Sequence, residues 1–144
     1  MATVEDTMGW LGGQRVFGRK IARPGSAIPL IEGGFPYGAL DHMAKSLGLQ
    51  GEQISAALGI PRRTLARRKA SRRLAPTESD RLYRLARLFA QTVSTLASAE
   101  RARDWLLKSN RSLGGRTPLE LSGTDAGARE VERVLGRIEH GIFS

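Results

Sequence analysis

The chain has 144 residues, so two compact modules and a loose terminal segment are about the most it can hold, and a large multidomain enzyme is excluded. It contains no cysteine, which excludes disulfides, thiolate nucleophiles and sulfur-ligated zinc. The formal net charge is +9, and seven of these excess positive charges fall within residues 35–98, where eleven basic side chains stand against four acidic ones. A local excess of this kind favours a polyanionic partner.

The chain gives no sign of export or of membrane insertion. No stretch approaches the ~18–20 apolar residues of a membrane helix. The first residues, MATVEDTMGWLGG, lack the basic region and the following apolar region of a secretory signal. We therefore expect a cytoplasmic protein with no membrane partner.

Residues 1–35 form a glycine-rich N-terminal arm. Its glycines, together with Pro24 and Pro29, interrupt short apolar pieces and exclude a long helix. Two alternatives stay open at this point. The arm is disordered, or it carries short strands that pair with a second subunit and support dimerisation. We favour partial order.

From residue 37 onward the apolar spacing becomes helical. The first helix carries one apolar face, ends at Gly48, and buries Tyr37, Leu40, Met43, Ala44 and Leu47. A short helix is expected over residues 51–58 and a third from about Pro61 to Lys69, joined by Gly59-Ile60-Pro61. Small Ser55 permits a close helix crossing. This is the layout of a helix-turn-helix, with a core of Ile54, Leu58, Ile60 and Leu65.

The second helix of such a unit lies in the major groove of DNA, with its N-terminal residues nearest the base edges. Arg62, Arg63 and Arg67 are predicted to read bases, and Thr64 to meet a phosphate or a thymine methyl. The other cations are predicted to bind phosphates: Arg68, Lys69, Arg72 and Arg73. The alternative is a solvated helix face, but seven basic residues among twelve with no acidic one favour nucleic acid. RNA is less favoured, because the segment lacks exposed aromatic side chains beyond Tyr83.

Four further helices are expected after residue 75. A long helix starts near Pro76 and carries an apolar stripe of Leu82, Leu85, Phe89, Val93 and Leu96. The others cover residues 99–107, a short stretch after Thr117, and residues 125–140. Thr117-Pro118-Leu119-Glu120 has the form of a capping box. The last helix has a buried stripe of Val131, Val134, Leu135 and Ile138, and Gly141 stops it.

Catalytic and cofactor motifs are not recognisable in the chain. The stretch from Gly13 to Lys20 has the glycines of a phosphate-binding loop, but Lys20 is followed by Ile21 where serine or threonine is required. His42 and His140 are not at the spacing that builds a zinc site on one helix face. We therefore expect no catalytic residue, metal or cofactor, and a protein that is not an enzyme.

The C-terminal half carries a set of spaced motifs. They are Arg81-Leu82-x-Arg84-Leu85-Ala86-Arg87, Ala102-x-x-Trp105-Leu106, Asn110, Leu113-Gly114-Gly115-Arg116-Thr117-Pro118-Leu119-Glu120-Leu121, Gly127, Val131, Leu135 and Arg137-Ile138-Glu139-His140-Gly141. With the helix-turn-helix before them, they resemble the Xre/MbcA/ParS family of antitoxins from bacterial type II toxin–antitoxin pairs. The resemblance covers about residues 36–144 and leaves the N-terminal arm outside.

We expect an all-α fold whose N-terminal arm at residues 1–35 lies outside the resemblance. The resemblance implies an Xre-like helix-turn-helix domain and linking helix at residues 36–98 and a toxin-binding domain at residues 99–144. It implies an antitoxin that neutralises a cognate toxin, usually a RES-domain protein that depletes NAD, and represses its own operon by binding operator DNA. A homodimer or higher oligomer is expected. The alternatives are a stand-alone phage-type repressor whose C-terminal domain serves only oligomerisation and, less favoured, a nucleoid or RNA-associated protein without sequence choice.

The predicted toxin contacts lie at the C-terminal end. The tail Gly141-Ile142-Phe143-Ser144 offers an apolar anchor and a terminal carboxylate that could plug a concave toxin site. Arg137, Glu139 and His140 are predicted to pair with polar groups around an NAD pocket; the alternative is that they are ordinary surface residues. We interpret five apolar residues of this region as core: Trp105, Leu106, Leu113, Leu119 and Leu121.

Overall fold

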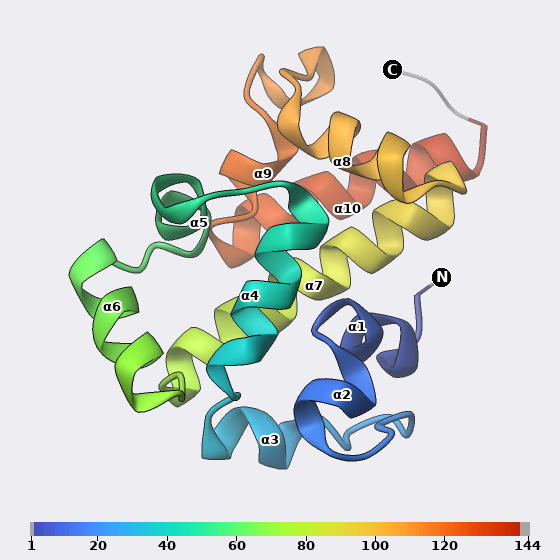
Figure 1. Ribbon diagram of the computed structural model, residues 1–144. Helices are drawn as coiled ribbons and strands as arrows, with labels where there is room; N and C mark the ends of the chain where they lie inside the picture. The colour runs from blue at the N-terminus through green and yellow to red at the C-terminus, as the bar shows by residue number, and fades with distance from the viewer. Residues whose placement is uncertain (1, 142–144) are drawn as a thin grey trace.

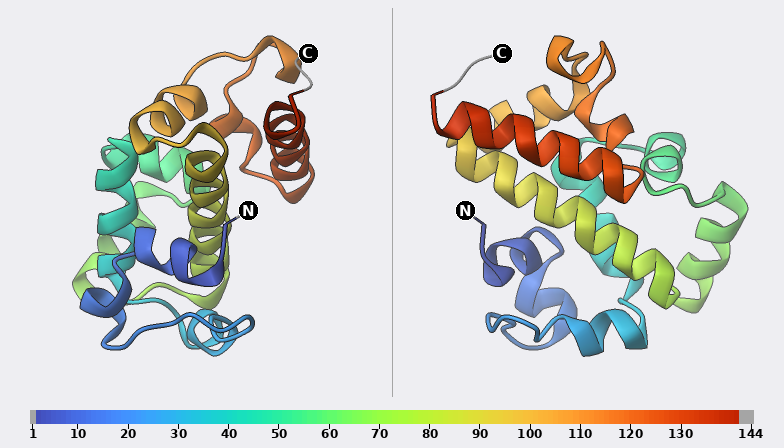
Figure 2. Two further views of the ribbon diagram at one scale, coloured as in Figure 1. Left: turned by 90° about the vertical axis from the view of Figure 1, so that its right-hand side faces the viewer. Right: turned by 180° about the vertical axis from the view of Figure 1, so that it is seen from behind.

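The computed structural model describes residues 2–141, which form ten α-helices, one short 3-10 helix and no strand. Helix α7 (Pro76–Leu96) runs through the middle of the molecule (Figure 1). Helix α4 (Tyr37–Leu47) lies on one side of α7 and α10 (Asp125–Glu139) on the other, so the molecule has three layers (Figure 2). No helix in this part of the chain is long and apolar enough to cross a membrane. The prediction of an all-α fold is confirmed.

The N-terminal arm folds as three short helices: α1 (Val4–Trp10), α2 (Gly13–Phe17) and α3 (Ile28–Gly33). Helices α1 and α3 pack against α7, and α2 packs against α1. Met8 and Leu11, which are 1% and 0% exposed, enter the core. Both earlier alternatives, disorder and short strands, are therefore wrong for residues 2–35. Glycine and proline limit the length of helices here, but they do not prevent short apolar pieces from burying against α7.

A capping motif in the sequence marks the start of α1. The Thr3 Oγ1 accepts the N–H of Asp6, and the Asp6 carboxylate accepts the N–H of Thr3, both at 3.0 Å. This reciprocal pair is a capping box, a local signal for a helix N-terminus. The motif Thr3-Val4-Glu5-Asp6 thus predicts the ordered helix that glycine content alone obscured.

The helices of the middle segment have nearly the predicted bounds. Helix α4 ends at Gly48, and α5 covers Gly51–Leu58. Helix α6 covers Arg62–Ser71, two residues longer at its end than expected, and Pro61 is its N-cap residue. Helix α7 begins at Pro76, as predicted.

The C-terminal segment contains α8 (Ala99–Leu107), the 3-10 helix η1 (Arg111–Leu113), α9 (Pro118–Leu121) and α10. The predicted capping box at Thr117 forms only in part. The Thr117 Oγ1 accepts the N–H of Glu120 at 3.1 Å, but the Glu120 carboxylate accepts the Thr117 hydroxyl at 2.9 Å instead of the backbone N–H. Helix α10 buries Val131, Val134 and Leu135 as predicted, and Ile138 is half-buried.

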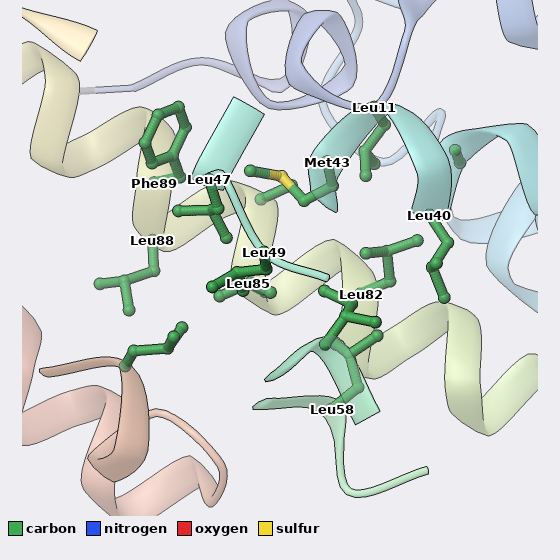
Figure 3. Packing of buried hydrophobic residues seen from close by; sticks show 14 of the residues in the cluster. Leu11, Leu40, Met43, Leu47, Leu49, Leu58, Leu82, Leu85, Leu88 and Phe89 are labelled. Atoms are coloured by element: carbon green, nitrogen blue, oxygen red, sulfur yellow. The ribbon is translucent and has the colours of Figure 1, made fainter. Parts of the chain in front are cut away.

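One hydrophobic core connects all parts of the fold. Leu82, Leu85, Leu88 and Phe89 of α7 lie at its centre, with side chains from the arm and from α4 around them (Figure 3). Leu106, Leu113 and Leu119 of the C-terminal segment are buried in the same core, while Trp105 and Leu121 are half-buried against it. Helix α7 is therefore shared by both ends of the molecule and fixes their relative position.

Candidate functional site

Helices α5 and α6 form the predicted helix-turn-helix. Gly59 ends α5 with a φ of 64°, a left-handed conformation that favours glycine. The turn is closed by two bonds between Ser55 and Ile60: the Ile60 N–H donates to the Ser55 carbonyl at 3.0 Å, and the Ser55 hydroxyl donates to the Ile60 carbonyl. The four predicted core residues Ile54, Leu58, Ile60 and Leu65 are all buried. This packing holds α6 at a fixed angle to α5.

A cation outside the motif also holds this turn. The guanidinium of Arg81, on α7, donates from Nη1 to the carbonyls of Leu58 at 3.4 Å and Gly59 at 3.2 Å. The last carbonyls of a helix carry partial negative charge, so a cation there stabilises the helix end. Sequence reasoning missed this role, because Arg81 is 22 residues from Gly59.

Helix α6 buries Leu65 and leaves most of its surface exposed. Arg62, Arg63, Arg67 and Lys69 are exposed and Thr64 is half-buried. Among residues 2–141, none of these four cations has a carboxylate within ion-pair distance, whereas seven other basic residues do. The exposed face of α6 therefore presents cations whose charge no neighbouring acid offsets, as a DNA-reading helix requires.

Arg62 differs from the other three in its surroundings. Its guanidinium lies beside Gly51 at the N-terminus of α5, so close that a Cβ added at Gly51 would be 2.9 Å from Nη2. Together with Gln50, Glu52 and Gln53 it lines a cavity of about 440 Å³. In helix-turn-helix proteins the first helix crosses the DNA backbone, and helix N-termini attract phosphates. This position suits a phosphate contact as well as the predicted base contact.

Two of the predicted phosphate-binding cations are used inside the fold. Arg68 donates from Nε and Nη2 to the two carboxylate oxygens of Glu78, at 2.9 and 3.2 Å. Arg73 donates from Nη1 to the carbonyl of Gly34 at 2.7 Å. Arg72 is exposed and ends α6 with a φ of 63°, a conformation that is rare for arginine. The structure thus separates the basic segment into cations that face outward and cations that hold the helix in place.

The ion pair between Arg68 and Glu78 joins α6 to α7. Glu78 also accepts the N–H of Ala75 at 2.8 Å and so caps α7. Burial raises the pKa of the Glu78 carboxyl. This effect is outweighed by hydrogen bonds from Arg68 and Ala75 and by the charges of Arg68 and Arg81, so the pKa lies below its usual value. The same pair raises the pKa of Arg68. Glu78 is therefore a charged anchor for α6.

At the other end of the molecule, the structure brings together part of the predicted toxin-binding set. Glu139 and His140 line a cavity of about 290 Å³ between α7 and α10, along with Gln91, Thr95 and Glu132. Arg137 and Gly141 are exposed but do not line it. Ile142, Phe143 and Ser144 lie outside the described residues.

The seam between α7 and α10 is polar where sequence patterns suggested only an apolar stripe. Arg87 Nη2 lies 3.4 Å from Glu132 Oε1. Gln91 Oε1 and the Nε atoms of Arg84 and Arg87 are buried without a hydrogen-bond partner among the described residues. These three residues share one face of α7, and Gln91 also lines the cavity beside His140. They are functional candidates that sequence reasoning missed, because the burial of their polar atoms depends on tertiary contact.

The described residues contain no group of three or more His, Asp or Glu side chains placed to hold a metal ion. His42 bonds through Nδ1 to the Trp10 carbonyl at 3.0 Å, which gives it a structural contact with α1.

Comparisons with known proteins agree with this arrangement. Residues 26–87 match a family model described as the antitoxin Xre-like helix-turn-helix domain, and residues 88–141 match the antitoxin Xre/MbcA/ParS C-terminal toxin-binding domain. A protein named Antitoxin Xre from Yersinia enterocolitica is 33% identical over 136 residues, which is 90% of this chain and 92% of the relative. Proteins of the same name from Photorhabdus laumondii (29%, covering 88% and 89%) and Pseudomonas putida (36%, covering 57% and 52%) are also similar. The two family models meet inside α7.

Proposed function

The chain belongs to the Xre/MbcA/ParS family of antitoxins, and from this premise we propose that it neutralises a cognate RES-domain toxin and represses its own operon. The observation that carries the proposal is that the two predicted binding surfaces lie at separate ends of the molecule. Unpaired cations on α6 lie at one end, and the toxin-binding domain with its cavity between α7 and α10 lies at the other. By this proposal the protein acts by binding the toxin and operator DNA and not by catalysis. Since operator DNA lies in the bacterial cytoplasm, we propose that the protein acts there.

The DNA-binding part of the proposal assigns roles within α6. Arg63 and Arg67 are four residues apart on its exposed face and read bases, with Arg62 and Thr64 beside them. Lys69 and Arg72 bind phosphates, and Arg68 and Arg73 add positive potential while they hold α6 to the rest of the fold. We propose a dimer or higher oligomer, because helix-turn-helix proteins commonly read two half-sites one helical turn apart.

The toxin-binding part assigns the C-terminal end. Glu139 and His140 contact polar groups of the toxin from the rim of their cavity, and Arg137 and Gly141 flank them. The tail residues Ile142, Phe143 and Ser144, which lie outside the described part of the chain, enter the concave toxin site. By this proposal the toxin depletes NAD and the tail obstructs its pocket.

Co-expression tests the proposal as a whole. The protein is produced together with the product of the adjacent gene, and growth, cellular NAD and co-purification are followed. We expect growth and NAD to be rescued and a stable complex to be recovered. No rescue and no complex, with operator binding retained, would favour the stand-alone repressor instead.

Three variants test whether the two ends act separately. Arg67→Ala and Arg62→Ala should relax operator choice, each by about 1–3 kcal/mol, and should leave toxin neutralisation intact. Deletion of residues 142–144 should weaken toxin neutralisation and leave operator binding intact. Arg129→Ala is the matched control, since Arg129 is exposed on α10 and pairs with Asp125. Equal weakening on operator and random DNA, or full neutralisation by the truncated chain, would contradict the corresponding assignment.

A further inference from the structure

A second basic surface lies on the N-terminal arm, away from α6. Arg15, Arg19, Lys20 and Arg23 are all exposed, and the sequence contains no acidic residue between Asp6 and Glu32. We call these four residues the arm patch. Neither the helix-turn-helix nor the toxin-binding end accounts for it.

The arm patch is held in place by the core. The loop between α2 and α3 is anchored by the buried side chains of Ile21 and Ala27. The N–H of Ser26 donates to the Arg23 carbonyl at 3.0 Å and closes a turn. Phe17, at the end of α2, packs edge-on against Phe35 with ring centroids 5.2 Å apart. The backbone that carries these cations is thus ordered before any ligand arrives, which lowers the entropic cost of binding.

Little of the charge of the arm patch is offset within the protein. Lys20 Nζ lies 3.4 Å from Glu5 Oε1, and both side chains are largely exposed, so this contact is weak. Arg15, Arg19 and Arg23 have no carboxylate within ion-pair distance among residues 2–141. Arg19, Lys20 and Arg23 line a cavity of about 370 Å³ that no acidic residue lines. A hollow of this kind attracts an anion such as a phosphate.

The arm is joined directly to the segment that follows α6. The N–H of Leu74 donates to the Phe35 carbonyl at 2.9 Å, and the Arg73 guanidinium donates to the Gly34 carbonyl at 2.7 Å. Figure 1 shows α2, α3 and α6 in the lower half of the molecule, with α6 at the left and the loop between α2 and α3 at the right, while α8 and α9 lie at the top. The arm patch therefore lies in the same half of the molecule as α6, but on the opposite side of that half.

We propose that the arm patch binds the phosphate backbone of the same DNA duplex that α6 reads, outside the base-read site. This inference rests on the proposed DNA-binding function. A duplex fits better than a single strand, because the patch has no exposed aromatic ring on which a base could stack, and Phe17 is half-buried against Phe35. Backbone contacts add affinity and salt dependence without sequence choice.

The test uses the full chain and the double variant Arg19→Ala/Arg23→Ala. The probes are duplexes of about 12 and about 30 base pairs from the region upstream of its own gene, roughly one and three helical turns. Affinity is measured by fluorescence anisotropy over a salt series. On the long duplex the slope of log affinity against log salt should become shallower by about 0.9 for each lost contact, or about 1.8 in total. At ~0.1 M salt this loss corresponds to an affinity that is roughly 60-fold weaker. On the short duplex the double variant should match the wild type.

Two matched variants define the outcome. Arg19→Lys/Arg23→Lys should retain the wild-type slope, and Arg129→Ala/Arg133→Ala, which removes the same charge from α10, should leave the slope nearly unchanged. An unchanged slope for Arg19→Ala/Arg23→Ala on the long duplex, or an equal loss on both duplexes, overturns the inference while the DNA-binding function stands. Retained DNA affinity with weaker toxin neutralisation would assign the patch to the toxin. A wild-type chain that binds neither duplex refutes the DNA-binding function and this inference with it.

Discussion

At the scale of single residues, Glu78 joins α6 to the central helix α7. It is 7% exposed and accepts hydrogen bonds from Arg68 and from the N–H of Ala75. A carboxylate in this position must stay charged to hold both groups. Its lowered pKa is the thermodynamic expression of that requirement.

Glu78→Gln should destabilise the fold by about 1–3 kcal/mol at neutral pH, because an amide cannot accept both arginine bonds and leaves part of a charged group unpaired. The folded pKa of Glu78 lies below its unfolded value, so the stabilisation is complete above the unfolded pKa and is lost as pH falls through the folded pKa. Urea unfolding over a pH series measures this. The difference between variant and wild type should shrink in acid, and a difference independent of pH would contradict the interpretation. Glu130→Gln, at an exposed pair with Arg133, should change stability by less than ~0.5 kcal/mol.

Arg72 and Ala97 are the two non-glycine residues with positive φ in the described chain, at 63° and 59°, and each ends a helix. Glycine removes the steric cost of this conformation, so Arg72→Gly and Ala97→Gly should each stabilise the fold by about 0.5–1 kcal/mol. Only Arg72→Gly should weaken DNA binding, because it removes a cation beside α6. Thermal unfolding and anisotropy check both effects. If the two variants bound DNA equally well, Arg72 would serve only as a helix cap.

At the scale of elements, the crossing of α9 and α10 depends on a glycine. A Cβ at Gly127 would lie 1.8 Å from the Leu121 carbonyl oxygen, so α10 could not keep its place against the end of α9. Gly136 on the same helix has no neighbour within 4 Å of such an atom. The two positions form a matched pair for the toxin-binding domain.

Gly127→Ala should cost about 3 kcal/mol or more, since backbone has to move to relieve the overlap. Gly136→Ala should stabilise α10 by up to about 1 kcal/mol through helix propensity. Thermal unfolding separates the two, and toxin neutralisation should fall for Gly127→Ala. Equal effects of the two alanines would show that the α9–α10 crossing is not tightly packed.

At the scale of the whole molecule, α7 makes both ends one cooperative unit. Trp10 of the arm packs edge-on against Phe89 of α7, with ring centroids 4.7 Å apart, and Trp105 of α8 is half-buried against the same core. These are the two tryptophans of the chain. Trp10 lies in the arm and Trp105 in the toxin-binding domain, so each reports on a different part of the fold.

Single-tryptophan variants test this cooperativity. Trp105→Phe leaves a probe in the arm, and Trp10→Phe leaves one in the toxin-binding domain. In each variant the urea midpoint from fluorescence should coincide with the midpoint from far-UV circular dichroism, because one core unfolds in one transition. An arm that separates first would give an earlier fluorescence midpoint in Trp105→Phe.

The sequence by itself determined the helices whose signals are local. The stripe from Tyr37 to Leu47, the turn at Gly59, the start of α7 at Pro76 and the stripe of α10 all lie within a few residues, so their spacing predicts them. The spaced motifs from Arg81 to Gly141, with the helix-turn-helix before them, carry the resemblance to the antitoxin family that the family models confirm.

Only the tertiary structure decided which distant segments these helices contact. It placed the glycine-rich arm in the core, where the N–H of Phe35 donates to the Ser79 hydroxyl across 44 residues of sequence. It bonded Arg68 to Glu78 while Arg67 stayed free, although both belong to one basic run. The physical reason is that burial and ion pairing depend on which distant segments meet, and that meeting is set by the packing of the whole core around α7, which no local pattern records.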